Sequence, residues 1–484
     1  MELIGSTLRE HMLRQPDKLA IISDEGNLTY HSLYKQVVEH QNTLLNLTGS
    51  NKKRIGLLIK EPSSFLSLFL AIVRIGWEAM PIDPKWTDEE FDHACNIGKP
   101  DVILTNSHRF CDDPMFVTLQ DLKKGNNEEK SYQFSSLTDF YVGFTSGSTG
   151  KPKGFTRTHE SWMKSFLVYE EAFKLSHENT IISPGPLCHS LSLFTAIHAI
   201  QLGATLHVSE FHRKHVAERL SSEGIDSFVG VPTMMEALME ELISMNKTND
   251  SLRNIIISGA GWSNQSKDKA ATIFPNATLY EYYGASELSF VMYKVGQAGG
   301  HQPFPTVRLK VLDENMKEVN KNEEGKLFID SPMLFSGYID HEEETNKVLT
   351  SYGATVGDIG FQNESGEVFI VGRESNMIKT GGLKVYPEEV EAILDTHPNI
   401  LQSIVYPLKD SYWGEKVVCS ILWEKQKEEL TLQQIKSYCE TKLSPYKIPK
   451  QIIKLPCFHY TKSGKIDRKA TIEGRTFGKD EKNE

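Results

Sequence analysis

A regular alternation of strand-like and helix-like segments over the first 290 residues limits the possible folds of this chain more than any other feature. Short apolar runs, such as 19–22, 54–59 and 102–104, alternate with longer stretches of helix length, such as 63–74. Strands that alternate with helix-length segments predict parallel sheets covered by helices on both faces. We therefore expect an α/β protein with doubly wound sheets, whose ligands lie at the carboxyl ends of the strands.

The pattern changes after residue 300, where short strand-like segments are separated by turn residues. Such segments lie at 307–312, 325–329 and 367–371. From about residue 376 strands and a helix recur in a compact stretch, which predicts a separate small α+β domain. A chain of 484 residues is also too long for a single hydrophobic core, so two or more domains are expected.

The stretch 145–154, Thr-Ser-Gly-Ser-Thr-Gly-Lys-Pro-Lys-Gly, predicts a phosphate-binding loop. Its glycines permit close backbone approach, its hydroxyls can donate to phosphate oxygens, and its two lysines supply positive charge. An ordinary polar loop between a strand and the helix-like segment 161–173 is the alternative. A Walker loop is excluded because position 145 is Thr and Pro152 follows Lys151. The candidate ligands are Thr145, Ser146, Gly147, Ser148, Thr149, Gly150, Lys151 and Lys153.

A second motif, Tyr-Tyr-Gly-Ala-Ser-Glu at 282–287, follows a strand-like segment. A tyrosine face can stack on a purine, and Ser286 can donate to a phosphate. Glu287 can coordinate a hard cation such as Mg²⁺ through its carboxylate oxygens. An isolated glutamate is more often a solvated surface charge, so this interpretation depends on the surrounding motifs.

Together the two motifs resemble the adenylate-forming superfamily of acyl-CoA synthetases, carrier-protein adenylation domains and luciferases. The loop matches the family signature throughout, and the Tyr-Gly-Xaa-Thr/Ser-Glu pattern matches at 283–287. Further matches follow in the order of the family, at 186–190, 258–262, 357–360, 372–391 and 461–469. The resemblance implies an N-terminal domain at 1–375 that includes a small β-barrel-like part, and a small mobile domain at 376–484.

The resemblance also implies roles for residues outside the loop. Glu287 would bind Mg²⁺, Lys465 would be the catalytic lysine between the substrate carboxylate and the α-phosphate, and His189 would lie between the acyl pocket and the thiol channel. Without the motif, His189 would be read as a packed structural residue. The remaining nucleotide contacts are expected at Ala260, Tyr282, Tyr283, Gly284, Ser286, Asp358 and Arg373.

The C-terminal motifs favour coenzyme A (CoA) as the thiol. The run 377–391 resembles that of acyl-CoA ligases more than that of peptide-synthetase domains. Gly381 and Gly382 would let the pantetheine arm pass close to the backbone, although a simple turn is the alternative. Trp413 resembles an aromatic residue that some relatives place against CoA, and Ser375 falls at the interdomain hinge. Trp262 departs from the family motif and either narrows the acyl pocket or is a buried structural residue.

The resemblance therefore predicts an ATP-dependent carboxylate–CoA ligase that uses Mg²⁺. It would form acyl-AMP and pyrophosphate, then acyl-CoA and AMP, from a fatty or aryl acid. A stand-alone adenylation enzyme that loads an acyl or amino acid onto an acyl or peptidyl carrier protein is the alternative. A catalytically silent binding protein is disfavoured because Glu287, Asp358, Arg373 and Lys465 are all present.

Charge and cysteine content exclude several other classes of protein. The net charge of −11 disfavours nucleic acid as the main partner. The six cysteines lie far apart without a Cys-x-x-Cys pair, which argues against a zinc centre or a disulfide framework. The most apolar stretch, 65–73, ends at Arg74, well short of the roughly 20 residues that a membrane-spanning helix needs. No secretory signal is expected in the first 20 residues, so we expect a cytoplasmic protein.

Overall fold

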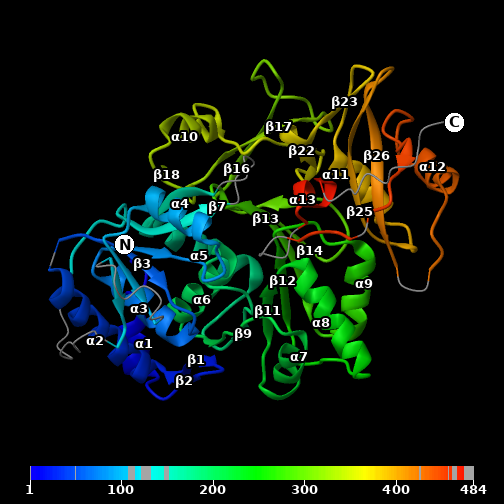
Figure 1. Cartoon of the computed structure of the whole chain (residues 1–484). Coiled ribbons are helices and arrows are strands. Elements are labelled where there is room, and N and C mark those ends of the chain that lie inside the picture. Colours follow the sequence, from blue (N-terminus) through cyan, green and yellow to red (C-terminus); the bar gives the residue numbers. More distant parts are fainter. Residues whose placement is uncertain are drawn as a thin grey trace.

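The computed structural model places a large N-terminal part, coloured blue to yellow in Figure 1, beside a smaller C-terminal part in orange and red. The residues that the structure describes are 2–49, 51–106, 115–120, 132–145, 152–424, 427–455, 457–460 and 466–473.

The first sheet of the N-terminal part contains nine of the described strands. They lie in the order β15-β14-β13-β12-β11-β9-β10-β1-β2. The pairs from β1 to β13 are parallel, and β2, β14 and β15 are antiparallel additions at the two edges. The bounds are β1 Leu19–Ser23, β2 Gly26–Thr29, β9 Thr180–Ile182, β10 Thr205–His207, β11 Ser227–Gly230, β12 Asn254–Ser258, β13 Thr278–Ala285, β14 Ser289–Val295 and β15 Gln302–Pro303.

The second sheet contains seven described strands in the order β18-β8-β7-β4-β3-β5-β6. Its pairs from β6 to β7 are parallel, whereas β8 and β18 are antiparallel. The bounds are β3 Arg54–Leu58, β4 Glu78–Pro81, β5 Val102–Thr105, β6 Phe116–Thr118, β7 Asp139–Thr145, β8 Lys153–Thr158 and β18 Gly337–Tyr338.

Strand β8 was not expected from the sequence. The glycine-rich stretch therefore joins two antiparallel strands, with Thr145 opposite Lys153, and the helix begins only after β8. The segment Lys153–Thr158 contains Lys, Gly and Arg and has a weak strand signal of its own. It is a strand because β7 pairs with it on one side and β18 on the other, and such long-range pairing overrides local preference.

The helices cover both sheets and fill the space between them. Helix α3 is buried on all sides over nine consecutive residues, Phe65 to Val73, because it packs inside a core that also takes in strands of both sheets. Helix α5 begins where the Thr158 side chain accepts a hydrogen bond from the Ser161 N–H. The N-terminal helices are α1 Leu8–Arg14, α2 Tyr30–Thr48, α3 Pro62–Arg74, α4 Asp88–Gly98, α5 His159–Phe173, α6 Ser190–Leu202, α7 Arg213–Ser222, α8 Pro232–Ser244 and α9 Asn264–Ile273.

A third, antiparallel sheet follows where the turn-punctuated strands were expected. Its described strands are β16 Arg308–Leu312, β17 Gly325–Asp330, β19 Leu349–Thr350, β20 Gly353–Ala354, β21 Asp358–Gln362 and β22 Val368–Arg373, with helix α10 Glu342–Val348 inserted between β18 and β19. The pairing of β21 with β22 sets Asp358 directly opposite Arg373. This register decides the geometry of one half of the candidate site.

The C-terminal part has its own sheet and its own hydrophobic core. Ile378, Val390, Val405 and Ile435 belong to this core, which is separate from those of the N-terminal sheets. The elements are β23 Ile378–Thr380, β24 Leu383–Val385, α11 Pro387–Leu394, β25 Ile400–Asp410, β26 Gly414–Trp423, α12 Leu432–Glu440, β27 Gln451–Ile452 and α13 Arg468–Glu473. The predicted α/β fold with a small C-terminal domain is confirmed. No helix in the described ranges is both long and apolar enough to cross a membrane.

Candidate active site

The predicted site residues that the structure describes follow strands at the carboxyl ends of the sheets. Thr145 ends β7, Ala260 follows β12, and Glu287 follows β13. Residues 146–151 of the glycine-rich loop and Lys465 lie outside the described residues. The candidate ligands Ser146, Gly147, Ser148, Thr149, Gly150 and Lys151 therefore have no structural account here.

Lys153, at the far end of the loop, forms an ion pair with α10. Its Nζ lies 2.8 Å from Glu344 Oε2 and 5.3 Å from the centre of the Tyr338 ring. Hydrogen bonds from Lys153 and Lys347 lower the pKa of Glu344 to about 2, so this carboxylate stays ionised near neutral pH. Neither Tyr338 nor Glu344 was singled out in the sequence.

Glu287 is half-buried and is held by Tyr338 from β18. The Tyr338 hydroxyl donates to Glu287 Oε1 at 2.6 Å, and the Glu287 carbonyl accepts from the Phe335 N–H at 2.9 Å. Burial, followed by the charge of Glu287, raises the pKa of Tyr338, which therefore remains a neutral donor. Because Tyr338 contacts both Lys153 and Glu287, it brings the end of the glycine-rich loop together with the predicted Mg²⁺ ligand.

Arg157 on β8 is a buried cation that the sequence reasoning missed. Its side chain is only 3% exposed, and it donates to Ser161 Oγ at 3.2 Å, to the Ser286 carbonyl at 3.2 Å and to the Met333 carbonyl at 2.7 Å. Burial lowers its pKa to about 10. Arg157 thus ties the backbone beside Glu287 to the strand after the loop. The sequence around Arg157, Lys-Gly-Phe-Thr-Arg-Thr, carries no local signal of this burial.

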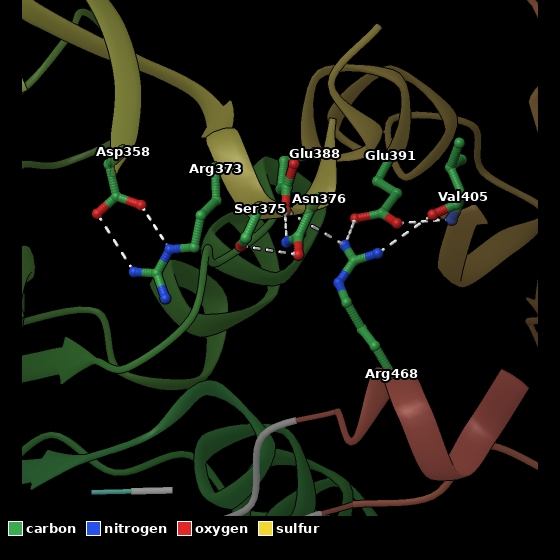
Figure 2. Close-up of polar contacts among 8 residues, drawn as sticks. All are labelled: Asp358, Arg373, Ser375, Asn376, Glu388, Glu391, Val405 and Arg468. Carbon is green, nitrogen blue, oxygen red and sulfur yellow. Dashed lines mark hydrogen bonds and ion pairs between the residues drawn. The ribbon is translucent and has the colours of Figure 1, made fainter. Parts of the chain in front are cut away.

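Asp358, Arg373 and Tyr283 form one hydrogen-bonded group. Arg373 donates to both carboxylate oxygens of Asp358, through Nε at 2.7 Å and through a terminal nitrogen at 3.3 Å, as Figure 2 shows. The Tyr283 hydroxyl also donates to the Asp358 carboxylate. Burial alone would lower the pKa of Arg373, but the contact with Asp358 outweighs burial and raises it. The predicted ribose-binding pair is therefore assembled, and Tyr283 is joined to it.

The two adjacent tyrosines point to opposite faces of β13. The Tyr282 ring packs 4.8 Å from the Phe290 ring and 5.9 Å from the Phe173 ring, inside the aromatic core. Burial raises the pKa of Tyr283 first, and the charges of Asp358 and Glu287 raise it further, so Tyr283 lies near both carboxylates. This placement favours Tyr283 as the residue beside the adenine and a packing role for Tyr282.

Gly284 allows β13 and β14 to approach closely at their turn. A Cβ added at Gly284 would lie 2.0 Å from the Ser289 carbonyl oxygen, which no side chain could tolerate. Ser286, in the turn itself, is half-buried and offers its carbonyl to Arg157. The requirement for glycine at 284 is therefore explained by the backbone, independently of any ligand.

The segment after β12 contains the exposed Ala260 and, two residues later, the buried Trp262. Ala260 is exposed, and Ser258 Oγ donates to the Tyr282 carbonyl at 3.0 Å. Trp262 is 5% exposed, packs into the core of the first sheet and donates from its indole nitrogen to Glu236 at 3.2 Å. Of the two roles considered for Trp262, the structure supports the buried structural one.

His189 lies at the junction of the two N-terminal sheets. Asp83 follows β4 of the second sheet, and Cys188 and His189 precede α6 beside the first sheet. The potential ligand atoms of these three residues all lie within 4.8 Å of one another. A contact of 3.3 Å between the hydroxyls of Tyr141 and Ser190 also joins β7 to α6. The start of α6, directly after His189, therefore lies beside β7, the strand that leads into the glycine-rich loop.

Gly381 and Gly382 form the turn between β23 and β24, with φ values of +57° and +80°. The turn alone accounts for both glycines, as the simpler alternative proposed. A Cβ at Gly381 would lie 3.1 Å from the Trp413 ring, so the indole lies against this turn. Trp413 is 40% exposed, beside the still more exposed Tyr412. An open groove of about 670 Å³ nearby is lined by Lys379, Lys409, Asp410, Ser411, Gly414 and Glu415.

Ser375 lies in a 3₁₀ turn, Glu374–Asn376, that links β22 to β23. Its hydroxyl donates to Asn376 Oδ1 at 3.3 Å. The Asn376 amide donates in turn to Glu388 Oε1 at 2.5 Å, at the start of α11 (Figure 2). The predicted hinge residue is therefore placed between the sheet that carries Arg373 and the C-terminal part.

Comparison with known proteins identifies the family. Residues 8–339 match the family model of AMP-binding enzymes, and residues 389–465 match that of the AMP-binding enzyme C-terminal domain. The chain belongs to the AMP-binding enzyme family. The predicted membership of the adenylate-forming superfamily, in its acyl-CoA ligase branch, is confirmed.

Three comparisons illustrate the range of similar AMP-binding enzymes. YhfT of Bacillus subtilis, an uncharacterized acyl–CoA ligase, is 35% identical, with 94% of each chain covered. VraA of Staphylococcus epidermidis, provisionally named a long chain fatty acid–CoA ligase, is 29% identical over 97% of this chain and 98% of VraA. The o-succinylbenzoate CoA synthetase MenE of Bacillus subtilis, solved with ATP and a magnesium ion, is 19% identical, covers 97% and 99% of the two chains, and superposes with a TM-score of 0.85.

In this AMP-binding enzyme two groups can be distinguished among the described candidates. Tyr283, Asp358, Arg373 and Glu287 lie within electrostatic range of one another in the N-terminal part. Gly381, Gly382 and Trp413 lie together at one turn of the C-terminal part. Glu287 provides the oxygen ligands that Mg²⁺ prefers, and Tyr338 fixes the orientation of one of its oxygens.

Proposed function

We propose that this AMP-binding enzyme is an ATP-dependent carboxylate–CoA ligase. It converts an acid and ATP into acyl-AMP and pyrophosphate, and then converts acyl-AMP and CoA into acyl-CoA and AMP. The observation that carries the proposal is the group formed by Tyr283, Asp358 and Arg373 beside Glu287. The names of the relatives YhfT and VraA, both acyl–CoA ligases, support it.

The assembled group would bind the nucleoside of ATP. The Asp358 carboxylate can accept hydrogen bonds from ribose hydroxyls, and Arg373 both orients that carboxylate and supplies further donors. Tyr283 offers an aromatic face for the adenine. The exposed backbone at Ala260 is proposed to run along the adenine ring.

Phosphate binding is proposed for the glycine-rich loop and for Ser286. Lys153, which pairs with Glu344, is proposed to turn from this carboxylate toward the triphosphate. Mg²⁺ held by Glu287 would offset the negative charge of the triphosphate. These interactions all reduce the repulsion between ATP and the incoming carboxylate.

In the first half-reaction a carboxylate oxygen of the acid forms a bond to the α-phosphorus, and the bond from this phosphorus to the pyrophosphate oxygen breaks. We assign the positive charge between the two anions to Lys465, on the strength of its Gly-Lys motif in the sequence. In the second half-reaction the CoA sulfur attacks the acyl carbon, and AMP leaves with the bonding electrons.

The thiol is proposed to approach from the C-terminal part. We propose a boundary at Ser375, with domains at 1–375 and 376–484, and a rotation there between the half-reactions. Gly381 and Gly382 would then contact the pantetheine arm, and His189 would lie where the acyl pocket meets the thiol channel. Exposed Trp413 and the nearby Lys379 offer an aromatic ring and a positive charge to the nucleotide end of CoA.

The acid is proposed to be a fatty or aryl acid. The names of the relatives favour such substrates. The segments expected to line the acyl pocket, 189–194, 231–235, 258–262 and 284–290, contain no Asp, Glu, Lys or Arg apart from Glu287, which is assigned to Mg²⁺, and so offer no carboxylate for an amino group. ATP and CoA are both abundant in the cytoplasm, which is the location that we propose.

Pyrophosphate release tests the proposal directly. The purified protein is incubated with Mg-ATP and a panel of fatty, aryl, hydroxy and amino acids, each with and without CoA. We expect turnover that rises strongly with CoA and a CoA thioester detected by mass spectrometry. Lys465→Ala should abolish acid-dependent pyrophosphate release while retaining ATP binding. A single burst of acyl-adenylate that CoA does not affect would contradict the CoA assignment and direct the search to a carrier protein as the thiol partner.

A further inference from the structure

Arg468, the first residue of α13, connects this helix to α11. Its guanidinium forms an ion pair with Glu391 and lies 3.9 Å from Glu388, both on α11. It also donates to the Val405 carbonyl of β25 at 3.2 Å. Figure 2 shows the side chain reaching from α13 into the space between these groups. Arg468 therefore has three partners in two other elements of the C-terminal part.

Glu391 requires a cationic partner because its carboxylate is largely buried. Its side chain is 12% exposed, and Oε1 also accepts from the Val405 N–H at 2.6 Å. Burial raises the pKa of Glu391, whereas the charge and hydrogen bond of Arg468 lower it. Removing the cation from a buried carboxylate lowers the free energy of unfolding far more than removing it from an exposed carboxylate. The ion pair therefore resists separation and fixes the start of α13 on α11.

The same helix is attached to the domain boundary. Glu388, which faces Arg468, accepts the 2.5 Å hydrogen bond of Asn376, the residue after Ser375. Helix α11 thus contacts the boundary turn at its beginning and α13 one turn later. Residues 466 and 467, directly before α13, are held as well, because Ile466 pairs with Tyr460 and the Asp467 N–H donates to the His459 carbonyl at 2.9 Å.

We propose that Arg468 is a positioning residue for the adenylation half-reaction. Lys465 precedes Arg468 by three residues, and three extended residues span at most roughly 10 Å. The proposed effect of the anchor on α11 is transmitted to Lys465 through this short length of chain. This inference rests on the proposed function, in which Lys465 acts in adenylation only.

The two half-reactions distinguish this role from a purely structural one. Adenylation is measured as acid-dependent pyrophosphate release, and thioester formation is measured by supplying preformed acyl-adenylate and CoA. We expect Arg468→Gln to lower the kcat of adenylation by about 10- to 100-fold, with KM for ATP and the rate of thioester formation within about twofold of the parent. Arg468→Lys, which keeps the charge but loses the planar fork, should restore part of the rate.

The matched control is Arg308→Gln, which removes an arginine from an exposed ion pair with Asp330 in the third sheet. Both half-reactions should be unchanged in this variant. Glu391→Gln should reproduce the Arg468→Gln defect, and the double variant should be no slower than either single one, because all three lose the same contact.

Equal loss of both half-reactions in Arg468→Gln would overturn the inference, because general destabilisation does not select one step. Lys465→Ala separates this result from a failure of the proposed function. If Lys465→Ala retains adenylation, the proposed role of Lys465 is wrong and the inference falls with it. If Lys465→Ala loses adenylation while Arg468→Gln keeps the parent rate, the inference alone is wrong.

Discussion

At the scale of single residues, the adjacent tyrosines of β13 show how position decides the role of a side chain. The motif marked both Tyr282 and Tyr283 as nucleotide contacts. Strand alternation, which places neighbours on opposite faces, sends Tyr282 into the aromatic core and Tyr283 toward Asp358. The two residues differ by one hydroxyl contact to a carboxylate, and this contact can be removed without touching the core.

Tyr283→Phe should raise KM for ATP by about 10-fold. The Asp358 carboxylate loses one charge-assisted hydrogen bond, which typically contributes about 1.5–3 kcal/mol, and keeps only Arg373 to orient it. Steady-state kinetics with varied ATP measures the effect. Tyr282→Phe makes the same chemical change one residue away and should leave KM for ATP within about twofold. Equal effects of the two substitutions would remove Tyr283 from the nucleotide site.

Sequence reasoning found the residues that carry a motif and missed those that support them. Asp358, Arg373 and Glu287 could be named because they occur at characteristic spacings. Arg157 and Tyr338 could not, because their importance comes from side-chain hydrogen bonds to residues about 130 and 50 positions away in the chain, respectively. Nothing local distinguishes a buried arginine on β8 from a solvated one until β7 and β18 are seen on either side of it.

At the scale of elements, local patterns predicted most strands and helices correctly. The helix expected at 63–74 is α3, and the strands expected at 54–59 and 102–104 are β3 and β5. Apolar runs of this kind must be buried in any fold of the chain, so their composition is enough to predict that they form core strands or helices. The hairpin of β13 and β14 depends instead on close backbone approach at Gly284, which a motif cannot explain.

Gly284→Ala should abolish most acid-dependent pyrophosphate release. The added Cβ would meet the Ser289 carbonyl at 2.0 Å, so the turn that presents Ser286 and Glu287 must shift. Gly261→Ala, a control in the loop after β12, adds a Cβ with nothing within 4 Å and should retain activity. Activity and the melting temperature are compared for both variants. Normal turnover in Gly284→Ala would show that the turn can relax without moving the catalytic residues.

Asp395→Asn should become stabilising as the pH rises. Burial raises the pKa of Asp395, which accepts from Ser403 Oγ at 2.7 Å, from 3.8 to about 7. The native carboxyl therefore holds its proton between about pH 4 and 7 while the unfolded one does not. Its contribution to stability is complete below pH 4 and is lost as the pH rises through 7.

The asparagine carries no such titration. The melting temperature of Asp395→Asn relative to the parent should therefore increase by a few degrees between pH 5 and pH 8, as measured by calorimetry. A difference that stays constant over this range would show that Asp395 is ionised in the folded protein at both pH values.

At the scale of the whole molecule, the two parts have separate main cores, and they meet at a short boundary turn and in a small shared cluster of Ile359, Val371 and Tyr386. The change in pattern after residue 300 and the order of the motifs predicted this division. The ion pairs of α11 with α13 were not predictable, because the partners Glu391 and Arg468 lie 77 residues apart in the chain. From the sequence alone, the charged residues of the segments that form α11 and α13 are expected to be solvated, because nothing local indicates that they pack together.

Ser375→Pro should slow overall turnover by about 10-fold or more. Proline fixes φ near −65° and also restricts the preceding residue, so the boundary turn loses the freedom that domain rotation requires. Adenylation alone should be less affected than the complete reaction, as judged by the ratio of pyrophosphate release to thioester formation. Ser375→Ala keeps a flexible backbone and should resemble the parent. Parent rates for both steps in Ser375→Pro would place the rotation at another residue.

The ion pair of Lys153 with Glu344 has a consequence for the release of pyrophosphate. An isolated ammonium at the end of a phosphate-binding loop would hold any small phosphate that reached it. In this protein the ammonium has a carboxylate counterion at 2.8 Å. On the proposed function, Lys153 pairs with Glu344 again as pyrophosphate leaves, so its positive charge remains neutralised. Neutralised in this way, Lys153 would bind free phosphate and pyrophosphate, both of which are common in the cell, less strongly than an isolated ammonium would.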